Sequence, residues 1–211
     1  TGWARGQVAI DFDHAQRIAR LEEERDVVRV AERMAVMEAL IGDLQRRGAR
    51  WVINTGRDLS SVMEGIARSR LSIQPDFLVT VEREVFIHDG SRYVPHAPWN
   101  DRCRQEHEQL FASVRPEVPR LTRWVTERFR ATIYEDSFSP FCLIAGNNAD
   151  ADRIQEFIDS FCATLPGLTL VRNDVYARFS HAAFNKGTAL AEIGRLLGVP
   201  PARTFAAGDH L

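Results

Sequence analysis

The sequence predicts an α/β protein: a Rossmann-like three-layer core around a parallel sheet, with an inserted α+β domain that carries an antiparallel sheet. In the first part of the chain, short β-branched runs alternate with helix-prone segments, which is the rhythm of a parallel sheet with helices on its faces. From residue 82 onward, strand-like pairs separated by helical stretches indicate antiparallel pairing instead. We therefore expect the core over residues 1–81 and 181–211, and the insert over residues 82–180.

The core elements follow from apolar periodicity and from residues that end helices. The run 8–10 is short, apolar and β-branched, as in a buried strand. Residues 30–44 repeat apolar side chains at i, i+3 and i+4 spacing, which predicts a helix whose methionines face a core and which Gly48 ends. The remaining core elements are expected as strands over 51–54, 76–81 and 204–207 and as helices over 59–71 and 186–197.

The insert opens with a predicted hairpin. Asp89-Gly90 separates two strand-like runs, 85–88 and 92–95, and this dipeptide favours a tight type I′ turn. The other expected elements of the insert are helices over 101–114, 118–129 and 149–163 and strands over 131–134, 141–144, 168–171 and 175–179.

The composition is that of an ordinary globular protein. The formal net charge of −2 gives no reason to expect nucleic acid or an anionic membrane as a partner. No apolar run approaches the ~20 residues that a membrane helix needs, and no secretory signal opens the sequence. Cys103, Cys142 and Cys162 lack metal-site spacing, so we expect buried free thiols and a cytoplasmic location. The oligomeric state stays open.

Two aspartates end the first apolar run, at the kind of position where α/β proteins bind ligands. Ligands of open α/β sheets lie beyond the carboxyl ends of the strands, which is where Asp11 and Asp13 fall. Carboxylates at that edge suit Mg²⁺, because this hard cation takes oxygen ligands. In the alternative interpretation, the pair merely ends a strand and begins a turn.

Three further polar motifs follow in a fixed order. Thr55-Gly56 comes directly after the second strand, Lys186 opens an amphipathic helix, and Gly208-Asp209 follows the last strand. Together with the Asp-x-Asp, these motifs resemble the four motifs of the haloacid-dehalogenase-like superfamily of phosphohydrolases. The resemblance runs from Val8 to Asp209, and the segment 80–85 is similar to the corresponding stretch of sucrose-phosphate phosphatases.

The chain departs from the family pattern in two places. His14-Ala15 stands where the family usually has Gly-Thr after the Asp-x-Asp. The sequence ends at Leu211, two positions before the second aspartate of the family's acidic loop would fall. We therefore expect the last strands and helix of the family core to lie outside this sequence.

The resemblance implies a Mg²⁺-dependent phosphomonoesterase with a large cap, acting on a small polar phosphate ester, with a sugar phosphate as the expected substrate. It makes Asp11 the nucleophile that forms an aspartyl-phosphate and Asp13 the general acid–base. Asp11, Asp13 and Asp209 would hold the Mg²⁺.

The resemblance also assigns residues to the phosphate and to the rest of the substrate. Thr55 and Gly56 would bind the phosphoryl oxygens, and Lys186 would offset the negative charge of phosphate and nucleophile. Arg178 and His181 are candidates to face the substrate from the cap. Two alternatives stay open: a phosphomutase or phosphotransferase on the same fold, and a non-catalytic binding protein, which His14-Ala15 and the incomplete acidic loop would suit.

Overall fold

The computed structural model describes residues 32–207. The expected strand over 8–10 and the predicted site residues Asp11, Asp13 and Asp209 lie outside the described residues, as does His14. The chain divides into two compact units, one made of Thr1–Trp51 with Arg70–Gln74 and the other of Val52–Ser69 with Pro75–Leu211.

The described part of the first unit is a helix with a short partner segment. Residues 32–46 are helical, and Gly48 with its positive φ of 91° follows the helix as predicted. The carboxylate of Glu38 accepts hydrogen bonds from the backbone N–H and the hydroxyl of Ser72. The expectation that the methionines face a core is wrong for Met37, which is 41% exposed.

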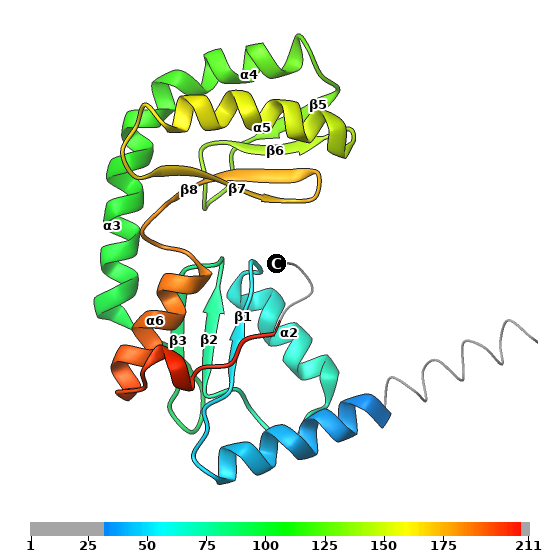
Figure 1. Cartoon of the computed structure of the whole chain (residues 1–211), viewed down its shortest axis with the longest axis vertical. Coiled ribbons are helices and arrows are strands. Elements are labelled where there is room, and N and C mark those ends of the chain that lie inside the picture. Colours follow the sequence, from blue (N-terminus) through cyan, green and yellow to red (C-terminus); the bar gives the residue numbers. More distant parts are fainter. Residues whose placement is uncertain (1–31, 208–211) are drawn as a thin grey trace, which may run out of the picture. The chain divides into compact units, whose positions relative to one another are not determined.

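The second unit contains a four-stranded sheet, sheet A, in the order β1-β2-β3-β4 (Figure 1). Its strands are β1 (Val52–Asn54), β2 (Phe77–Thr80), β3 (Glu84–His88) and β4 (Tyr93–Pro95). The pair β1–β2 is parallel, as the intervening helix α2 (Leu59–Ser69) predicts, and the other two pairs are antiparallel. The predicted hairpin therefore forms, with His88 paired to Tyr93, but its turn is not the predicted type I′, because Gly90 has a positive φ and Asp89 does not. The hairpin extends sheet A, whereas the sequence analysis grouped it with the insert. The alternation of apolar and polar residues can predict a hairpin, but it does not predict which sheet the hairpin joins.

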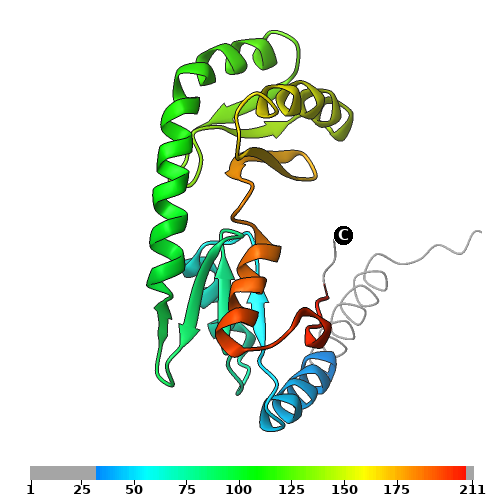
Figure 2. The ribbon, with the colours of Figure 1, turned by 60° about the vertical axis from the view of Figure 1, so that its left-hand side comes forward.

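Alternating side chains of sheet A enter two different apolar clusters. One face packs with Val62 of α2, and the opposite face packs with Ala189 and Ile193 of α6 (Lys186–Leu197). The strand residues of these two faces are Leu78 and Phe86 toward α2, and Phe77, Val79 and Val85 toward α6. Figure 2 shows α6 (orange) and α2 (cyan) on opposite sides of the strands, which is the expected three-layer core.

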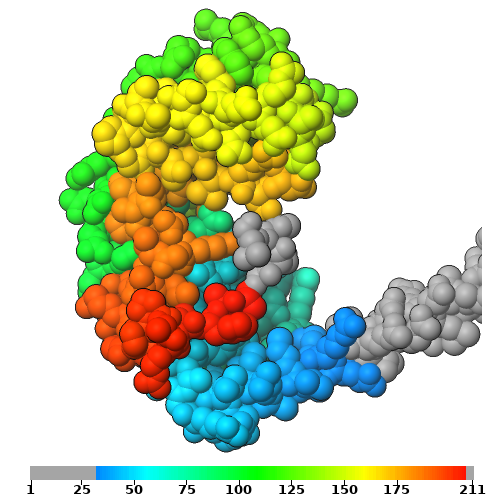
Figure 3. Space-filling view, viewed as in Figure 1, coloured from blue at the N-terminus to red at the C-terminus, as the bar shows by residue number. Residues whose placement is uncertain are grey.

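A second four-stranded sheet, sheet B, is antiparallel throughout, in the order β5-β6-β8-β7. Its strands are β5 (Ala131–Tyr134), β6 (Cys142–Ala145), β7 (Leu168–Asn173) and β8 (Tyr176–His181). The helices α4 (Val118–Thr126) and α5 (Asn148–Cys162) supply Leu121, Val125, Ile154 and Ile158 to the cluster that also holds Leu143 and Phe179 of the sheet. In the space-filling view α5 (yellow) forms much of the surface of this part (Figure 3).

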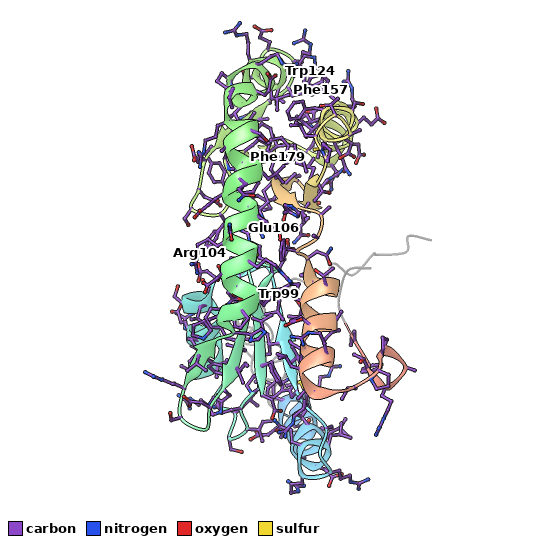
Figure 4. The ribbon with its side chains drawn as sticks, turned by 90° about the vertical axis from the view of Figure 1, so that its left-hand side faces the viewer. Trp99, Arg104, Glu106, Trp124, Phe157 and Phe179 are labelled. Atoms are coloured by element: carbon purple, nitrogen blue, oxygen red, sulfur yellow. The ribbon has the colours of Figure 1, made fainter. Side chains whose placement is uncertain are left out.

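The helix α3 (Ala97–Val114) belongs to both apolar cores. Trp99 and Cys103 enter a cluster with residues of sheet A, while Phe111 and Val114 enter the cluster of sheet B. Figure 4 shows Trp99 near the start of this helix and Glu106 farther along it. The helix begins four residues before the predicted range, because Pro98 suits a first helical turn.

The start of α3 is also hydrogen-bonded to β3. The side-chain amide of Asn100 accepts from the Val85 N–H at 2.8 Å and donates to the Val85 carbonyl at 2.9 Å. The indole of Trp99 donates to the carbonyl of Arg83 at 2.7 Å. These bonds fix the turn between β2 and β3, which carries the site described below.

Three further predictions have mixed outcomes. The strand expected over 204–207 does not form, and Phe205 is 90% exposed. The three cysteines are free and buried as expected, and burial raises the pKa of Cys103 and of Cys142 to about 11. No helix within residues 32–207 is long and apolar enough to cross a membrane.

Candidate functional site

The first component of the site is the loop that follows β1. The Thr55 N–H donates to the carbonyl of Val79 at 2.9 Å, which continues the contact with β2 by one residue. The Thr55 hydroxyl accepts from the Arg57 N–H at 3.3 Å, and this bond turns the chain away from the sheet. Asp58 then starts α2, where its carboxylate accepts from the Ser61 N–H at 2.7 Å. Thr55 and Gly56 therefore lie at the carboxyl edge of sheet A, where the sequence places them.

The second component is a strained turn directly after β2. Val81 and Glu82 have positive φ values of 44° and 67°. A non-glycine residue in this region costs about 1–3 kcal/mol, and a β-branched one is a clear outlier. The turn is held by hydrogen bonds from the Val81 N–H to the Arg57 carbonyl at 2.9 Å and from the Glu82 N–H to the Thr55 carbonyl at 3.0 Å. The turns after β1 and β2 thus form one hydrogen-bonded unit.

The carboxylate of Glu82 joins both of these turns to two cations from distant parts of the chain. One oxygen accepts from Arg178 Nη2 at 3.2 Å, and the other lies 3.7 Å from Lys186 Nζ. Arg178 also donates to the Val81 carbonyl at 3.1 Å. An ideal Cβ on Gly56 would lie 3.5 Å from Glu82 Oε1, so the Glu82 side chain lies directly against Gly56.

Lys186 is positioned by the N-terminus of α6. Asn185 is the N-cap, and its side chain accepts from the N–H groups of Gly187 and Thr188. The side chain of Asn54, the last residue of β1, donates to the Lys186 carbonyl at 3.0 Å and so fixes the first turn of the helix beside the sheet. The helix N-terminus and the ammonium group both favour a bound anion at this place.

His181 contacts α3 and the turn that follows β8. Its Nδ1 accepts from the Ala183 N–H at 3.1 Å, and its Nε2 lies 3.8 Å from a carboxylate oxygen of Glu106. Its backbone N–H donates to His107 Nε2 at 3.2 Å. Burial lowers the pKa of His181, and it lowers that of His107 to about 3, so His107 is a neutral packing group.

The structure thus brings four predicted site residues together around Glu82 and sets a fifth beside α3. Thr55, Gly56, Arg178 and Lys186 converge on the turn 81–82, whereas His181 contacts Glu106 and His107. Asp11, Asp13 and Asp209 lie outside residues 32–207, so their assigned roles stay predictions.

Glu82 and Arg83 were not predicted as site residues. Arg83 is buried, and its Nη2 donates to the carbonyl of Phe138 at 3.1 Å, while its Nη1 has no hydrogen-bond partner among the described residues. Burial and the neighbouring Arg178 lower its pKa. A usable signal exists in the sequence, because these two charged residues follow the strand 76–81 as directly as Thr55 follows the strand before it.

A metal site cannot be built from the described residues alone. Within 32–207, no group of three or more His, Cys, Asp or Glu side chains is placed to hold a metal ion. A surface hollow of about 830 Å³ beside β7 lies elsewhere, in the part that carries sheet B. Its arginine, Arg172, already bonds to Asp152, Gln155 and the Asp174 carbonyl, which leaves it little capacity for a ligand.

Comparisons with known proteins identify the fold. No family model matches the chain, and no curated protein matches it either. Among solved structures, the sucrose-phosphatase from Synechocystis sp. PCC6803, in complex with sucrose and phosphate, matches with a TM-score of 0.58 and 17% identity over 81% of this chain and 67% of that one. A haloacid dehalogenase-like hydrolase from B. subtilis matches with a TM-score of 0.52 and 16% identity over 82% and 76%. The expected fold is therefore confirmed: the chain has the core-plus-cap fold of haloacid-dehalogenase-like hydrolases.

Proposed function

We propose that this protein is a phosphatase that hydrolyses a small polar phosphate ester, with a sugar phosphate as the first candidate. The observation that carries the proposal is the convergence of Thr55, Gly56 and Lys186, from distant parts of the sequence, on one edge of sheet A. Phosphoryl transfer depends mainly on positioning and on neutralising charge, and these groups are suited to both tasks. The fold shared with the Synechocystis sucrose-phosphatase supports the proposed substrate class.

The identity of Lys186 is a further argument. It is the only lysine in the sequence, and the other 26 of the 27 basic residues are arginines. A solvated cation at a helix start would serve equally well as arginine, but lysine presents a compact charge that fits close to a phosphoryl oxygen and a carboxylate. The single use of lysine at this position favours a specific electrostatic role over a surface role.

In the proposed reaction, Asp11 attacks the phosphorus atom and the alkoxide of the substrate leaves with a proton from Asp13. Asp13 then removes a proton from the water that hydrolyses the aspartyl-phosphate. The Thr55 hydroxyl and the adjacent backbone N–H groups bind phosphoryl oxygens, and Lys186 offsets their charge. The carboxylates of Asp11 and Asp209 and the backbone carbonyl of Asp13 would hold Mg²⁺, since this ion prefers hard oxygen donors, and the ion would supply further charge neutralisation.

We propose that the insert is a cap over this site, with sheet B and the helices α3, α4 and α5 as its body. Arg178 at β8 already contacts the site through Glu82, and with His181 it would face the part of the substrate beyond the phosphate. A cap of this kind would exclude water and restrict the size of the substrate.

The decisive experiment measures phosphate release from a panel of hexose phosphates with and without Mg²⁺, using the wild type and Asp11→Asn. We expect Mg²⁺-dependent turnover of at least one ester, which Asp11→Asn abolishes. Asp101→Asn, the same change at an exposed carboxylate on α3, is the matched control and should leave turnover intact. Absence of turnover on every ester, or turnover that Asp11→Asn leaves unchanged, would overturn the proposal. Interconversion of isomers without net phosphate release would favour the phosphomutase instead.

A further inference from the structure

The side chain of Glu82 lies beside both Gly56 and Lys186, two residues of the proposed phosphate site. It lies against Gly56, with Oε1, Cγ and Cδ at 3.5, 3.6 and 3.7 Å from an ideal Cβ there. The same oxygen, Oε1, is 3.7 Å from Lys186 Nζ. Within residues 32–207, a carboxylate therefore faces both the Thr55–Gly56 loop and the lysine.

The backbone holds this carboxylate in position. Glu82 and Val81 both have left-handed backbone conformations, and the Glu82 N–H bonds to the Thr55 carbonyl at 3.0 Å. Arg178, whose side chain is only 5% exposed, donates to Glu82 Oε2 at 3.2 Å and so draws the carboxylate toward β8. A strained turn that persists because its surroundings determine it is characteristic of functional sites.

The charges at this place make the carboxylate a competitor of an anionic ligand. Glu82 supplies one negative charge to Lys186 and Arg178, which together carry two positive charges. A phosphate group that approaches Lys186 must displace this carboxylate or tolerate its repulsion at short range. Removal of the negative charge should therefore strengthen phosphate binding.

We propose that Glu82 is a resident carboxylate that competes with the substrate phosphate for Lys186 and the Thr55–Gly56 loop, and so sets the affinity of the site for phosphate. The inference rests on the proposed phosphatase function and adds to it a residue that determines affinity. Glu82 acts through Lys186 and Arg178 and takes no part in the bond changes.

The test uses Lys186 as a probe, because it is the only lysine among the 211 residues. Reductive methylation with ¹³C-formaldehyde keeps its charge and gives a side-chain NMR signal, which Lys186→Met assigns. Titration with inorganic phosphate then yields a dissociation constant without any turnover. We expect Glu82→Gln, which keeps the shape of the side chain, to lower this constant about tenfold, or ~1.4 kcal/mol.

The matched control is Glu84→Gln, two residues along the chain. Glu84 pairs with Thr80 in sheet A and forms no ion pair with Lys186 or Arg178 within the described residues, yet its replacement removes the same charge. Its dissociation constant should stay within twofold of the wild type. If Glu82→Gln does not fold, Glu82→Asp is the second variant. It moves the carboxylate away from Lys186 by one methylene and should lower the phosphate dissociation constant by a smaller factor.

The kinetics of the proposed reaction provide a second measurement. Glu82→Gln should lower KM and the inhibition constant of phosphate with little change in kcat, because it removes competition in the ground state. Wild-type turnover together with an unchanged or raised phosphate constant in Glu82→Gln would overturn the inference and leave the phosphatase proposal standing. A wild type that neither hydrolyses esters nor binds phosphate would overturn both.

Discussion

The core of sheet B and the site around Glu82 are built on opposite principles. The sheet B core is apolar throughout, with Phe141, Leu143, Ile154 and Phe179 almost completely buried. Its aromatic pairs pack in favourable geometries, such as Phe141 and Phe179 at 4.8 Å between ring centroids and the stacked Trp124 and Phe157 labelled in Figure 4. This region follows the ordinary rules of burial.

The site breaks those rules at several points. It holds a buried arginine, Arg83, whose Nη1 has no hydrogen-bond partner among residues 32–207, and two consecutive left-handed residues, Val81 and Glu82. It also holds the one lysine of a sequence whose other basic residues are arginines. Local violations of this kind are expected where function constrains the sequence. The contrast supports the proposal that the cores provide the stability of the fold, whereas the turn after β2 serves the proposed function.

The largest expected effect is a loss of stability in sheet B. Phe179→Ala removes a fully buried ring that packs between Phe141 and Phe161, and large-to-small changes of this kind cost about 3–5 kcal/mol. Denaturant unfolding should show this loss, while turnover per folded molecule stays close to the wild type. The control is Ile144→Ala on β6, an exposed position where the loss should stay below about 1 kcal/mol. Equal losses at both positions would contradict the assigned core.

The next effect should be confined to activity. Lys186→Arg keeps the charge, but its larger planar head cannot replace the compact ammonium beside Glu82 and the phosphate, so we expect kcat to fall about 10²-fold or more. Because Lys186 is 53% exposed, the melting temperature should barely change. Arg195→Lys, the reverse exchange on an exposed residue of the same helix, should leave kcat within twofold. Full activity in Lys186→Arg would remove the electrostatic argument for this residue.

The fold was predictable because its signals are local. The Asp-Gly dipeptide, the Asn185 cap and the apolar spacing of α6 all lie within a few residues, and the hairpin strands and α6 formed close to their expected bounds. The strand over 204–207 failed because a strand needs a partner, and the run alone cannot supply one. The same reason explains why the hairpin 84–95 was assigned to the insert and not to sheet A.

The site was predictable only in part. Motif order predicted that Thr55, Gly56 and Lys186 lie close together, and the structure places them at one edge of sheet A, where parallel strands end; their assignment to a phosphate site is a proposal. Glu82 was missed although it directly follows a predicted strand, because its proposed role depends on Arg178, a residue far along the chain, and on a left-handed backbone conformation that neither valine nor glutamate indicates. A glycine or asparagine at position 81 or 82 would have indicated a left-handed turn, whereas valine and glutamate rarely adopt this conformation and do not predict it.

The smallest expected effect concerns Glu192, a carboxylate that we expect to stabilise the fold without affecting phosphate binding. Glu192 on α6 accepts from Arg195 at 2.7 and 2.8 Å and contacts His96 at 2.9 Å, and these bonds, with Arg195 first, lower its pKa from 4.5 to about 2. A carboxyl group with a lowered pKa stabilises the fold above pH 4.5, and this stabilisation is lost as the pH falls toward 2.

Glu192→Gln should therefore melt at a lower temperature than the wild type at pH 6, and the difference should shrink steadily between about pH 4.5 and pH 2. Its phosphate affinity should not change, because Glu192 makes its contacts with Arg195 and His96 and has none with Glu82 or Lys186 in the described part of the chain. Thermal melts over this pH range, with Glu64→Gln at an exposed ion pair as the control, measure the effect. A difference in melting temperature that does not change with pH would show that Glu192 stabilises the fold by packing and not by its charge. A change in phosphate affinity would show that charges beyond the turn at Glu82 also affect the site.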